Sequence, residues 1–164
     1  MIKMILATDL DYAIGKNNEL LWSCSEDLAY FKAQTINKVV VMGSRTYTSL
    51  PFTNGLPSRD NIVLTSRYCT DHEGVTFICG VSALLDYIEY SYSRRQEVFI
   101  VGGASIYEQF KHIVDEVHWT TINKTYEDAD CFFDMSFVLD EDVFEKTSEE
   151  ELCEDVVVRV YKRK

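Results

Sequence analysis

Short apolar runs alternate with stretches of helical spacing along most of the chain. Apolar and β-branched runs bounded by turn signals are typical of buried strands, and they occur at residues 2–8, 38–42, 61–65, 75–79, 98–101, 114–122, 132–133 and 156–161. Helical spacing predicts helices at residues 23–34, 44–50, 81–90 and 104–111. The first of these has Ser23 as its predicted N-cap, with Glu26 three residues later as the partner in a capping box.

The order of these elements predicts an α/β fold. Strands and helices alternate over residues 1–110, which favours right-handed crossovers and a central, twisted, mostly parallel sheet. We expect about eight strands, the last of them antiparallel additions, flanked by about four helices. One domain takes about 150 residues, and no linker or repeat divides this chain, so a single domain is expected over residues 1–164.

The overall charge argues against one class of partner. The chain has 27 acidic and 16 basic residues, for a formal net charge of −11, whereas non-specific nucleic-acid binding needs a basic surface. We therefore expect no nucleic-acid partner.

No stretch approaches the ~18 consecutive apolar residues of a membrane span, and residues 1–10 lack the pattern of a secretory signal. The expectation is a cytoplasmic protein with no membrane partner.

The charge is also unevenly distributed. Residues 140–155 hold nine acids and one lysine, which is typical of a solvated surface that aids solubility. Residues 38–67 hold four cations against the single acid Asp60. This second region is therefore locally basic and suited to anionic ligands, although the whole chain is acidic.

Cysteine and histidine give no metal-binding pattern. The five cysteines are odd in number and irregularly spaced, with no CxxC, and the three histidines form no HExxH motif. We expect free thiols, no disulfide framework and no metal site.

Glycine turns follow two of the predicted strands, and a cation follows a third. Such turns let the backbone approach a phosphate at a helix N-terminus, and ligands of open parallel sheets bind at the carboxyl ends of strands. The segments concerned are Gly43-Ser44-Arg45-Thr46, Ser66-Arg67 and Gly102-Gly103-Ala104-Ser105. Two such junctions suggest a ligand with several phosphates, and Thr65, Ser66, Arg67 and Arg45 suit a 2′-phosphate. The alternatives are ordinary tight turns and solvated arginines.

A carboxylate, Asp27, falls in the first turn of the helix predicted at 23–34. The helix dipole alone favours an acid there. The alternative is functional, because Leu28 and Phe31 would form an apolar wall beside Asp27, and such a carboxylate can accept two hydrogen bonds from an N–H/NH₂ pair on a heterocycle.

In order along the chain, these residues resemble dihydrofolate reductase. The resemblance covers residues 1–135 and rests on Ile5, Ala7, Ile14-Gly15, Asn18, Trp22, Asp27-Leu28, Phe31-Lys32, Thr35, Asn37-Lys38, Met42-Gly43, Arg45-Thr46-Tyr47, Ser49-Leu50, Leu56-Pro57, Arg59, Asn61-Ile62, Val101-Gly102-Gly103, Ile106-Tyr107-Glu108-Gln109-Phe110, Thr120, Asp130 and Phe133. It implies NADPH-dependent reduction of 7,8-dihydrofolate to 5,6,7,8-tetrahydrofolate, by hydride transfer to pterin C6 and protonation at N5. It also implies a role in tetrahydrofolate biosynthesis and one-carbon metabolism.

The resemblance assigns the substrate site. Asp27 would bind the pterin 2-amino group and N3, with Thr120 supporting it, and Trp22 would bind a water near the pterin. Arg59 would pair with the α-carboxylate of the glutamate. The substrate would also contact Ile5, Leu28, Phe31, Lys32, Leu50 and Leu56. Antifolate inhibitors are expected to bind the same site.

The resemblance also assigns the NADPH site. The residues that would surround the nicotinamide or hold the phosphates and ribose are Ala7, Ile14, Gly15, Asn18, Gly43, Arg45, Thr46, Thr65, Ser66, Arg67, Val101, Gly102, Gly103, Ala104, Ser105, Ile106 and Tyr107. Catalysis would involve Asp27, Trp22, Tyr107 and Thr120. A cis peptide between Gly102 and Gly103 is implied, and a monomer is expected.

The sequence departs from the family pattern in several places. Leu21 precedes Trp22 where proline is common, Ser44 stands where arginine is common, Ala104 and Ala129 replace frequent glycines, and residues 51–55 include two extra positions. We expect a looser loop at 9–24 and a weaker preference for NADPH over NADH.

Two other functions remain open on the sequence alone: a reductase of the same fold acting on a pyrimidine intermediate of flavin synthesis, and a non-catalytic structural module. Arg59 favours folate, because it calls for a substrate carboxylate.

Overall fold

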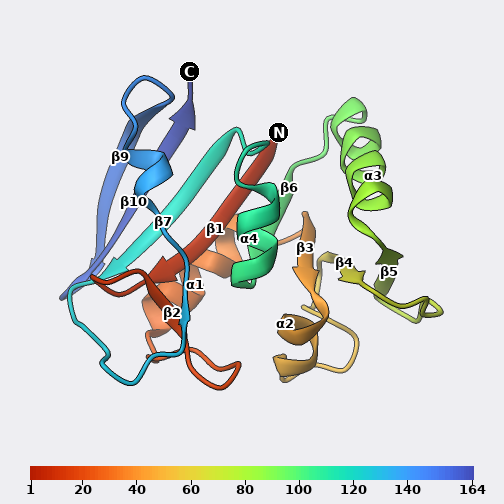
Figure 1. The fold of residues 1–164 in the computed structure, drawn as a ribbon, viewed down its shortest axis with the longest axis horizontal. Coiled ribbons are helices and arrows are strands. Elements are labelled where there is room, and N and C mark those ends of the chain that lie inside the picture. Colours follow the sequence, from red (N-terminus) through yellow and green to blue (C-terminus); the bar gives the residue numbers. More distant parts are fainter.

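A computed structural model describes residues 1–164, and an eight-stranded sheet in the order β5-β4-β3-β6-β1-β7-β10-β9 lies at its centre (Figure 1). The strands are β1 (Ile2–Thr8), β3 (Val39–Gly43), β4 (Asp60–Thr65), β5 (Val75–Cys79), β6 (Val98–Gly102), β7 (Glu116–Ile122), β9 (Phe144–Cys153) and β10 (Val156–Arg163). All neighbours from β5 to β7 are parallel, and β10 runs antiparallel to both β7 and β9. The predicted α/β class and mostly parallel sheet are confirmed.

Side chains alternate between the two faces of this sheet, as the strand period requires. Met4 and Leu6 of β1 pack in the larger apolar cluster, whereas Ile5 between them packs in the smaller one. The larger cluster includes residues of α3 (Val81–Ser93) and α4 (Ala104–Phe110). Residues of α1 (Ser25–Thr35) and α2 (Ser44–Ser49) pack against the smaller cluster. In Figure 1, α4 accordingly lies in front of the sheet and α1 behind it.

The start of α1 differs from the prediction. The helix begins at Ser25 and its N-cap is Cys24, whose Sγ accepts a hydrogen bond from the backbone N–H of Asp27 at 3.4 Å. The predicted cap at Ser23 and its capping box with Glu26 are wrong. A sulfur in place of an oxygen satisfies one of the free N–H groups of the first turn.

The acidic segment at residues 140–155 is mostly exposed, as expected, but it contains a strand that the apolar pattern did not predict. Most of it forms β9, an edge strand ten residues long that pairs with β10. Glu149 on β9 pairs with Lys146 at 2.8 Å and with Arg159 of β10 at 2.9 Å. Charged side chains on an edge strand discourage pairing with other chains, so the acids serve a structural purpose as well.

Residues 9–24 cross the end of the sheet and are fastened at two points. β2 (Ala13–Gly15) pairs with β8 (Cys131–Phe132) in a small second sheet. The buried carboxylate of Asp9 accepts hydrogen bonds from the backbone N–H groups of Asp11, Ala13 and Tyr126, at 2.8 to 2.9 Å. A short 3₁₀ helix, η1 (Ser136–Leu139), follows β8.

Charged side chains form a ladder across the amino ends of the parallel strands. Lys3 of β1 pairs with Glu97 at 2.8 Å and with Glu116 of β7 at 3.1 Å, and Glu97 also pairs with Lys38. Glu116 is hydrogen-bonded to His118 Nε2 at 2.6 Å. Hydrogen bonds from Lys3 and Lys38 lower the pKa of Glu97 to about 2. The ladder ties together the amino ends of β1, β3, β6 and β7.

Candidate active site

The carboxyl group of Asp27 lies half-buried in the first turn of α1. Burial raises the pKa of Asp27 above its usual value, and a hydrogen bond with the Thr120 side chain opposes that rise. Thr120 is buried on β7, where it pairs with Ala7 of the neighbouring strand β1. A carboxyl with a raised pKa and one fixed hydroxyl neighbour can bind a polar heterocycle and can hold a proton.

An apolar surface adjoins this carboxyl on the same face of the sheet. Phe31, Leu50 and Leu56 are half-buried and pack against the cluster that contains Ile5. Leu28 is 53% exposed, which leaves it free to contact a ligand. Lys32 is exposed. The structure thus brings Phe31, Leu50 and Leu56 together around Ile5, whereas Leu28 and Lys32 are exposed.

Arg59 is held in place by Thr35, at the end of α1. Its Nε and Nη2 both donate to Thr35 Oγ1, at 3.1 and 3.0 Å, and its Nη1 donates to the carbonyl of Pro57 at 2.7 Å. The guanidinium also lies over the ring of Phe31, 6.0 Å from its centroid. A guanidinium has five N–H donors, so these three bonds leave one donor on each Nη. That remaining pair suits a carboxylate approaching end-on.

The two predicted glycine junctions lie against each other. Gly43 ends β3 and caps α2, and Gly102 and Gly103 lead from β6 into α4. A Cβ on Gly103 would lie 3.4 Å from Thr46 Oγ1 of α2, and a Cβ on Gly102 would lie 3.2 Å from Tyr107 Oη. No side chain therefore covers the backbone at the glycines where α2 and α4 begin. The implied cis peptide at Gly102–Gly103 is confirmed.

Tyr107 stands behind this junction. Its hydroxyl donates to the carbonyl of Ile5 at 3.0 Å, and complete burial raises its pKa. It is therefore a neutral phenol that fixes the middle of β1 against α4. The other predicted residues of this junction follow directly along the chain: half-buried Val101 and Ala104, exposed Ser105 and buried Ile106.

Two arginines near these strand ends have free head groups. Arg45 at the start of α2 and Arg67 after β4 are exposed and make no ion pair. The hydroxyl of Thr65 donates to the carbonyl of Arg67, which fixes the turn that also contains exposed Ser66. The single O–H of Thr65 is thereby used within the turn, which leaves the Arg67 guanidinium and the Ser66 hydroxyl as its free donors for a phosphate.

The segment that precedes α1 contributes the remaining predicted residues. Ile14 and Gly15 belong to β2, and Ile14 packs against the larger cluster, while Asn18 is exposed in a turn with φ 63°. Trp22 packs on Tyr126, with ring centroids 5.7 Å apart. Its Nε1 is buried and makes no hydrogen bond within the protein, so it can donate to a bound group.

Comparison with known proteins agrees with this arrangement. The protein-family model described as dihydrofolate reductase matches residues 1–161. The chain belongs to the dihydrofolate reductase family. The dihydrofolate reductase of Bacillus subtilis (strain 168) is 35% identical over 127 residues, which is 77% of this chain and 72% of that one. The dihydrofolate reductase of Haemophilus influenzae is 35% identical over 130 residues, or 79% and 76% of the two chains.

A solved structure of a family member has the same fold. Dihydrofolate reductase from Enterococcus faecalis, complexed with NADP(H) and RAB-propyl, superposes with a TM-score of 0.83 at 29% sequence identity. The match covers 99% of this chain and 96% of that one. The resemblance that the sequence motifs indicated is therefore confirmed for the whole dihydrofolate reductase fold, including the antiparallel strands after residue 135.

The residues present fit a dinucleotide that carries a 2′-phosphate. A side chain at Gly102 or Gly103 would cover the backbone that is open to a ligand at this junction. Gly43 has a close neighbour as well, since a Cβ there would lie 3.1 Å from Ile106 Cγ1. Unpaired Arg45 and Arg67 provide the cations. The solved relative holds NADP(H), and the cofactor of this chain is NADPH.

Two residues that organise the site were not predicted to belong to it. Thr35 fixes Arg59, and its Oγ1 in turn donates to the carbonyl of Phe31 at 2.8 Å. Its sequence signals are its place among the motif residues of the resemblance and a hydroxyl at the C-terminal end of α1. Asp9 organises the loop before Trp22, and an aspartate two residues before a turn N–H is the recognisable signal for that role.

Proposed function

We propose that Asp27, Thr120 and Arg59 hold 7,8-dihydrofolate at both of its ends while NADPH reduces it. Membership of the family makes the chain an NADP-dependent oxidoreductase, and the reaction is reduction of 7,8-dihydrofolate to 5,6,7,8-tetrahydrofolate. The observation that carries the residue roles is the spare donor pair on Arg59, beyond the three hydrogen bonds that fix it. That pair suits a carboxylate on the substrate.

Asp27 binds and orients the pterin. Its carboxylate oxygens accept from the 2-amino group and N3, and the Thr120 hydroxyl holds the carboxyl at its place beside β7. Ile5, Phe31 and Leu50 exclude water from the pterin faces. Bound NADPH supplies the hydride that pterin C6 receives. The chain needs no nucleophile for such a transfer, because holding the two rings in contact geometry is its principal contribution.

The proton for N5 can reach the pterin by two routes. Either the Asp27 carboxyl provides it, or Asp27 polarises the pterin while a water held at Trp22 Nε1 delivers it. The raised pKa of Asp27 suits both, since it lets a proton reside in the site above the usual carboxyl range. Variant Trp22→Phe removes the N–H donor together with part of the indole ring, so a large loss of the hydride-transfer rate with unchanged NADPH affinity and unchanged stability selects the water route.

The cofactor contacts follow from the strand ends. Gly102 and Gly103 let the central phosphates approach the start of α4, with Thr46 of α2 beside them. Arg67 and the Ser66 hydroxyl donate to the 2′-phosphate, and Thr65 supports them by fixing the turn through its hydrogen bond to the Arg67 carbonyl. Only Arg45 and Arg67 supply positive charge to the phosphates, because the neighbour of Arg45 is the uncharged Ser44. The preference for NADPH over NADH is therefore weaker than is common in the family.

The decisive experiment follows the nicotinamide absorbance of NADPH with purified protein and dihydrofolate. Loss of absorbance that requires both protein and dihydrofolate supports the proposal, and no loss would leave a non-catalytic module. A pyrimidine intermediate of flavin synthesis serves as the competing substrate. Retention on an immobilised antifolate, reversed by dihydrofolate, tests the substrate site independently of turnover.

The oligomeric state, the cellular location and the domain organisation of the protein are also proposals. No helix of the structure is long and apolar enough to cross a membrane. We propose a monomer that acts in the cytoplasm on small, water-soluble substrates, within a single domain over residues 1–164. Sedimentation of the purified protein tests the monomer, and cell fractionation tests the location.

A further inference from the structure

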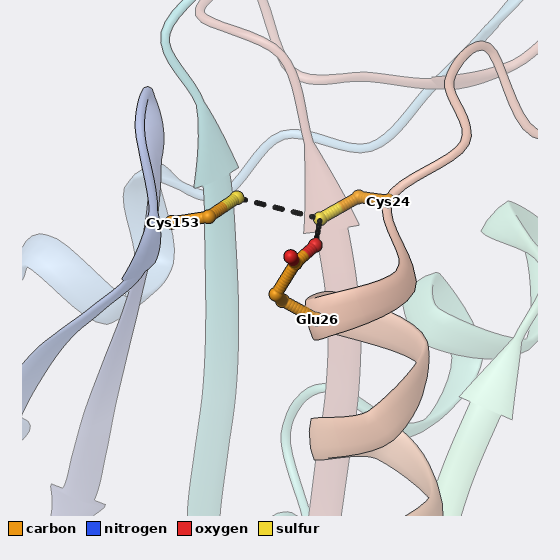
Figure 2. A group of neighbouring side chains, drawn as sticks. All are labelled: Cys24, Glu26 and Cys153. Carbon is orange, nitrogen blue, oxygen red and sulfur yellow. Dashed lines mark hydrogen bonds between the residues drawn. The ribbon is translucent and has the colours of Figure 1, made fainter.

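Three side chains from opposite ends of the chain converge at the start of α1. Cys24 caps this helix, Glu26 lies in its first turn, and Cys153 is the last residue of β9 (Figure 2). The two sulfurs are 3.8 Å apart, Cys24 Sγ lies 3.6 Å from Glu26 Oε2, and all three ligand atoms lie within 4.8 Å of one another. None of these residues has a role in the reduction described above.

These separations match the edges of a tetrahedral zinc site. Zinc binds thiolate sulfur at about 2.3 Å and carboxylate oxygen at about 2.0–2.2 Å, which places two sulfurs about 3.8 Å apart and a sulfur and an oxygen about 3.6 Å apart. The two distances from Cys24 Sγ agree with both values, and the third, between Cys153 Sγ and the Glu26 carboxylate, lies within 4.8 Å. Two soft sulfurs and one oxygen also favour zinc over magnesium or calcium, which prefer oxygen alone.

The surroundings hold the ligands in place and favour a cation. Glu26 Oε2 accepts a hydrogen bond from Ser25 Oγ at 3.0 Å, so this oxygen is already oriented. Glu154 and Asp155 follow Cys153 in the same cavity of about 260 Å³, and Lys124 is the one basic residue that lines it. The cavity leaves room for a water as the fourth ligand, and the acids keep the local charge negative.

We propose that Cys24, Glu26 and Cys153 bind one Zn²⁺ ion, with a solvent molecule completing a tetrahedron. The ion links the N-terminus of α1 to the hairpin formed by β9 and β10. Sequence spacing gave no sign of this site, because the two cysteines are 129 residues apart. The site adjoins the proposed substrate site, because Cys24 Sγ accepts from the backbone N–H of Asp27 at 3.4 Å. None of its three ligands is assigned to dihydrofolate or NADPH, so Zn²⁺ binding can be measured without turnover and its failure is distinguishable from failure of the proposed reduction.

The test measures Zn²⁺ affinity by competition with a chromophoric zinc indicator, on whole protein kept reduced by a phosphine. One equivalent should bind to the unchanged protein. Variants Cys24→Ser and Cys153→Ser should each weaken binding by more than about 100-fold, the upper end of what a residue outside the coordination sphere contributes. Cys79→Ser is the matched control, because Cys79 is an exposed thiol at the end of β5, and it should bind Zn²⁺ unchanged.

The Cys24→Ser variant should still fold, so a loss of Zn²⁺ binding can be assigned to the missing ligand. Serine is a better N-cap than cysteine, so Cys24→Ser keeps α1 capped while it removes a sulfur ligand. Cd²⁺ provides a second measurement, because its thiolate charge-transfer absorption should fall by about half when either cysteine is replaced. Saturating Zn²⁺ should also raise the urea midpoint of the unchanged protein but not that of Cys153→Ser.

Two results would overturn the site. One is Zn²⁺ binding that is equal in Cys153→Ser and Cys79→Ser, which would place the ion elsewhere. The other is an absence of stoichiometric binding to the reduced protein, including the case in which Cys24 and Cys153 merely form a disulfide in air.

Discussion

Thr35 and Arg59 meet through a single oxygen: Thr35 Oγ1 accepts from both Nε and Nη2 of Arg59, at 3.1 and 3.0 Å. The same hydroxyl donates to the carbonyl of Phe31. The guanidinium is thereby fixed relative to α1, with two donors still unused. A substrate carboxylate gains a pre-oriented partner and need not order a flexible side chain.

Replacing Arg59 by glutamine should weaken dihydrofolate binding selectively. Hydrogen bonds to a charged group contribute about 1.5–3 kcal/mol, so KM should rise by about 10- to 100-fold. A pterin substrate that lacks the glutamate should be reduced equally well by both proteins. Steady-state kinetics with the two substrates checks this, and an equal loss with both would show that Arg59 does not bind the carboxylate.

Thr35→Val removes the oxygen but preserves the shape of the side chain. Two guanidinium donors then lose their partner, and we expect a loss of about 1–3 kcal/mol in the free energy of unfolding. The KM for dihydrofolate should rise as well, since Arg59 is no longer fixed. Urea unfolding and kinetics measure the two effects, and Thr35→Ser, which retains the hydroxyl, should restore both.

Asp27→Asn should lower activity and raise stability together. Removal of an acid–base group costs about 100-fold or more in rate, so hydride transfer at neutral pH should fall at least that far, while NADPH affinity stays unchanged. Rapid-mixing kinetics and a cofactor titration measure these two quantities. An unaffected rate would remove Asp27 from the mechanism.

The stability effect of Asp27→Asn depends on pH. Burial raises the pKa of Asp27 above 3.8 on folding, so the folded state binds this proton more tightly than the unfolded state. The stabilisation that the folded protein gains from the proton on Asp27 is therefore fully present below pH 3.8, and it is lost as the pH rises through the pKa of Asp27 in the folded state. Thermal melts should show the variant to be more stable at neutral pH, with the difference shrinking toward pH 3.8.

Glu97→Gln should show the opposite pH dependence. Hydrogen bonds from Lys3 and Lys38 lower the pKa of Glu97 from 4.5 to about 2 in the folded protein. Its stabilising effect is thus present above pH 4.5 and is lost as the pH falls through about 2. Urea unfolding at pH 7 should find the variant less stable, with the gap narrowing below pH 4.5. A gap that is constant over this range would contradict the ion pairs.

Arg67→Gln should distinguish the two nicotinamide cofactors. If its guanidinium binds the 2′-phosphate, the KM for NADPH should rise by about 10- to 100-fold, while that for NADH stays unchanged. In the unchanged protein we expect the NADPH to NADH ratio of kcat/KM to lie below about a thousand, because Ser44 supplies no second cation beside Arg45. Parallel rises for both cofactors would show that Arg67 acts elsewhere.

Local features of this fold could be predicted from the sequence. The apolar runs that became β1 and β5 match their predicted limits, and Gly43 and Gly102 mark the two strand–helix junctions as expected. Each of these signals lies within a few adjacent residues. The order of the family motifs then identified the fold and function, which no single motif could do.

Features that depend on distant partners could not be predicted. β9 is polar along most of its length and has little strand propensity, so only its pairing with β10 makes it a strand. The N-cap of α1 is Cys24 and not the predicted Ser23, although serine is the commoner N-cap residue. Thr35 and Arg59, and likewise Cys24 and Cys153, meet only because the fold brings their elements together.

The charged ladder and the ligand-binding residues lie at opposite ends of the parallel strands. Lys3, Glu97 and Glu116 begin or precede strands, whereas Gly43, Thr65 and Gly102 end them. Because distant substitutions without shared partners have additive effects, changes that alter ligand affinity leave the ladder intact. The chain can therefore acquire tolerance to an inhibitor and recover lost stability in separate evolutionary steps, taken in either order.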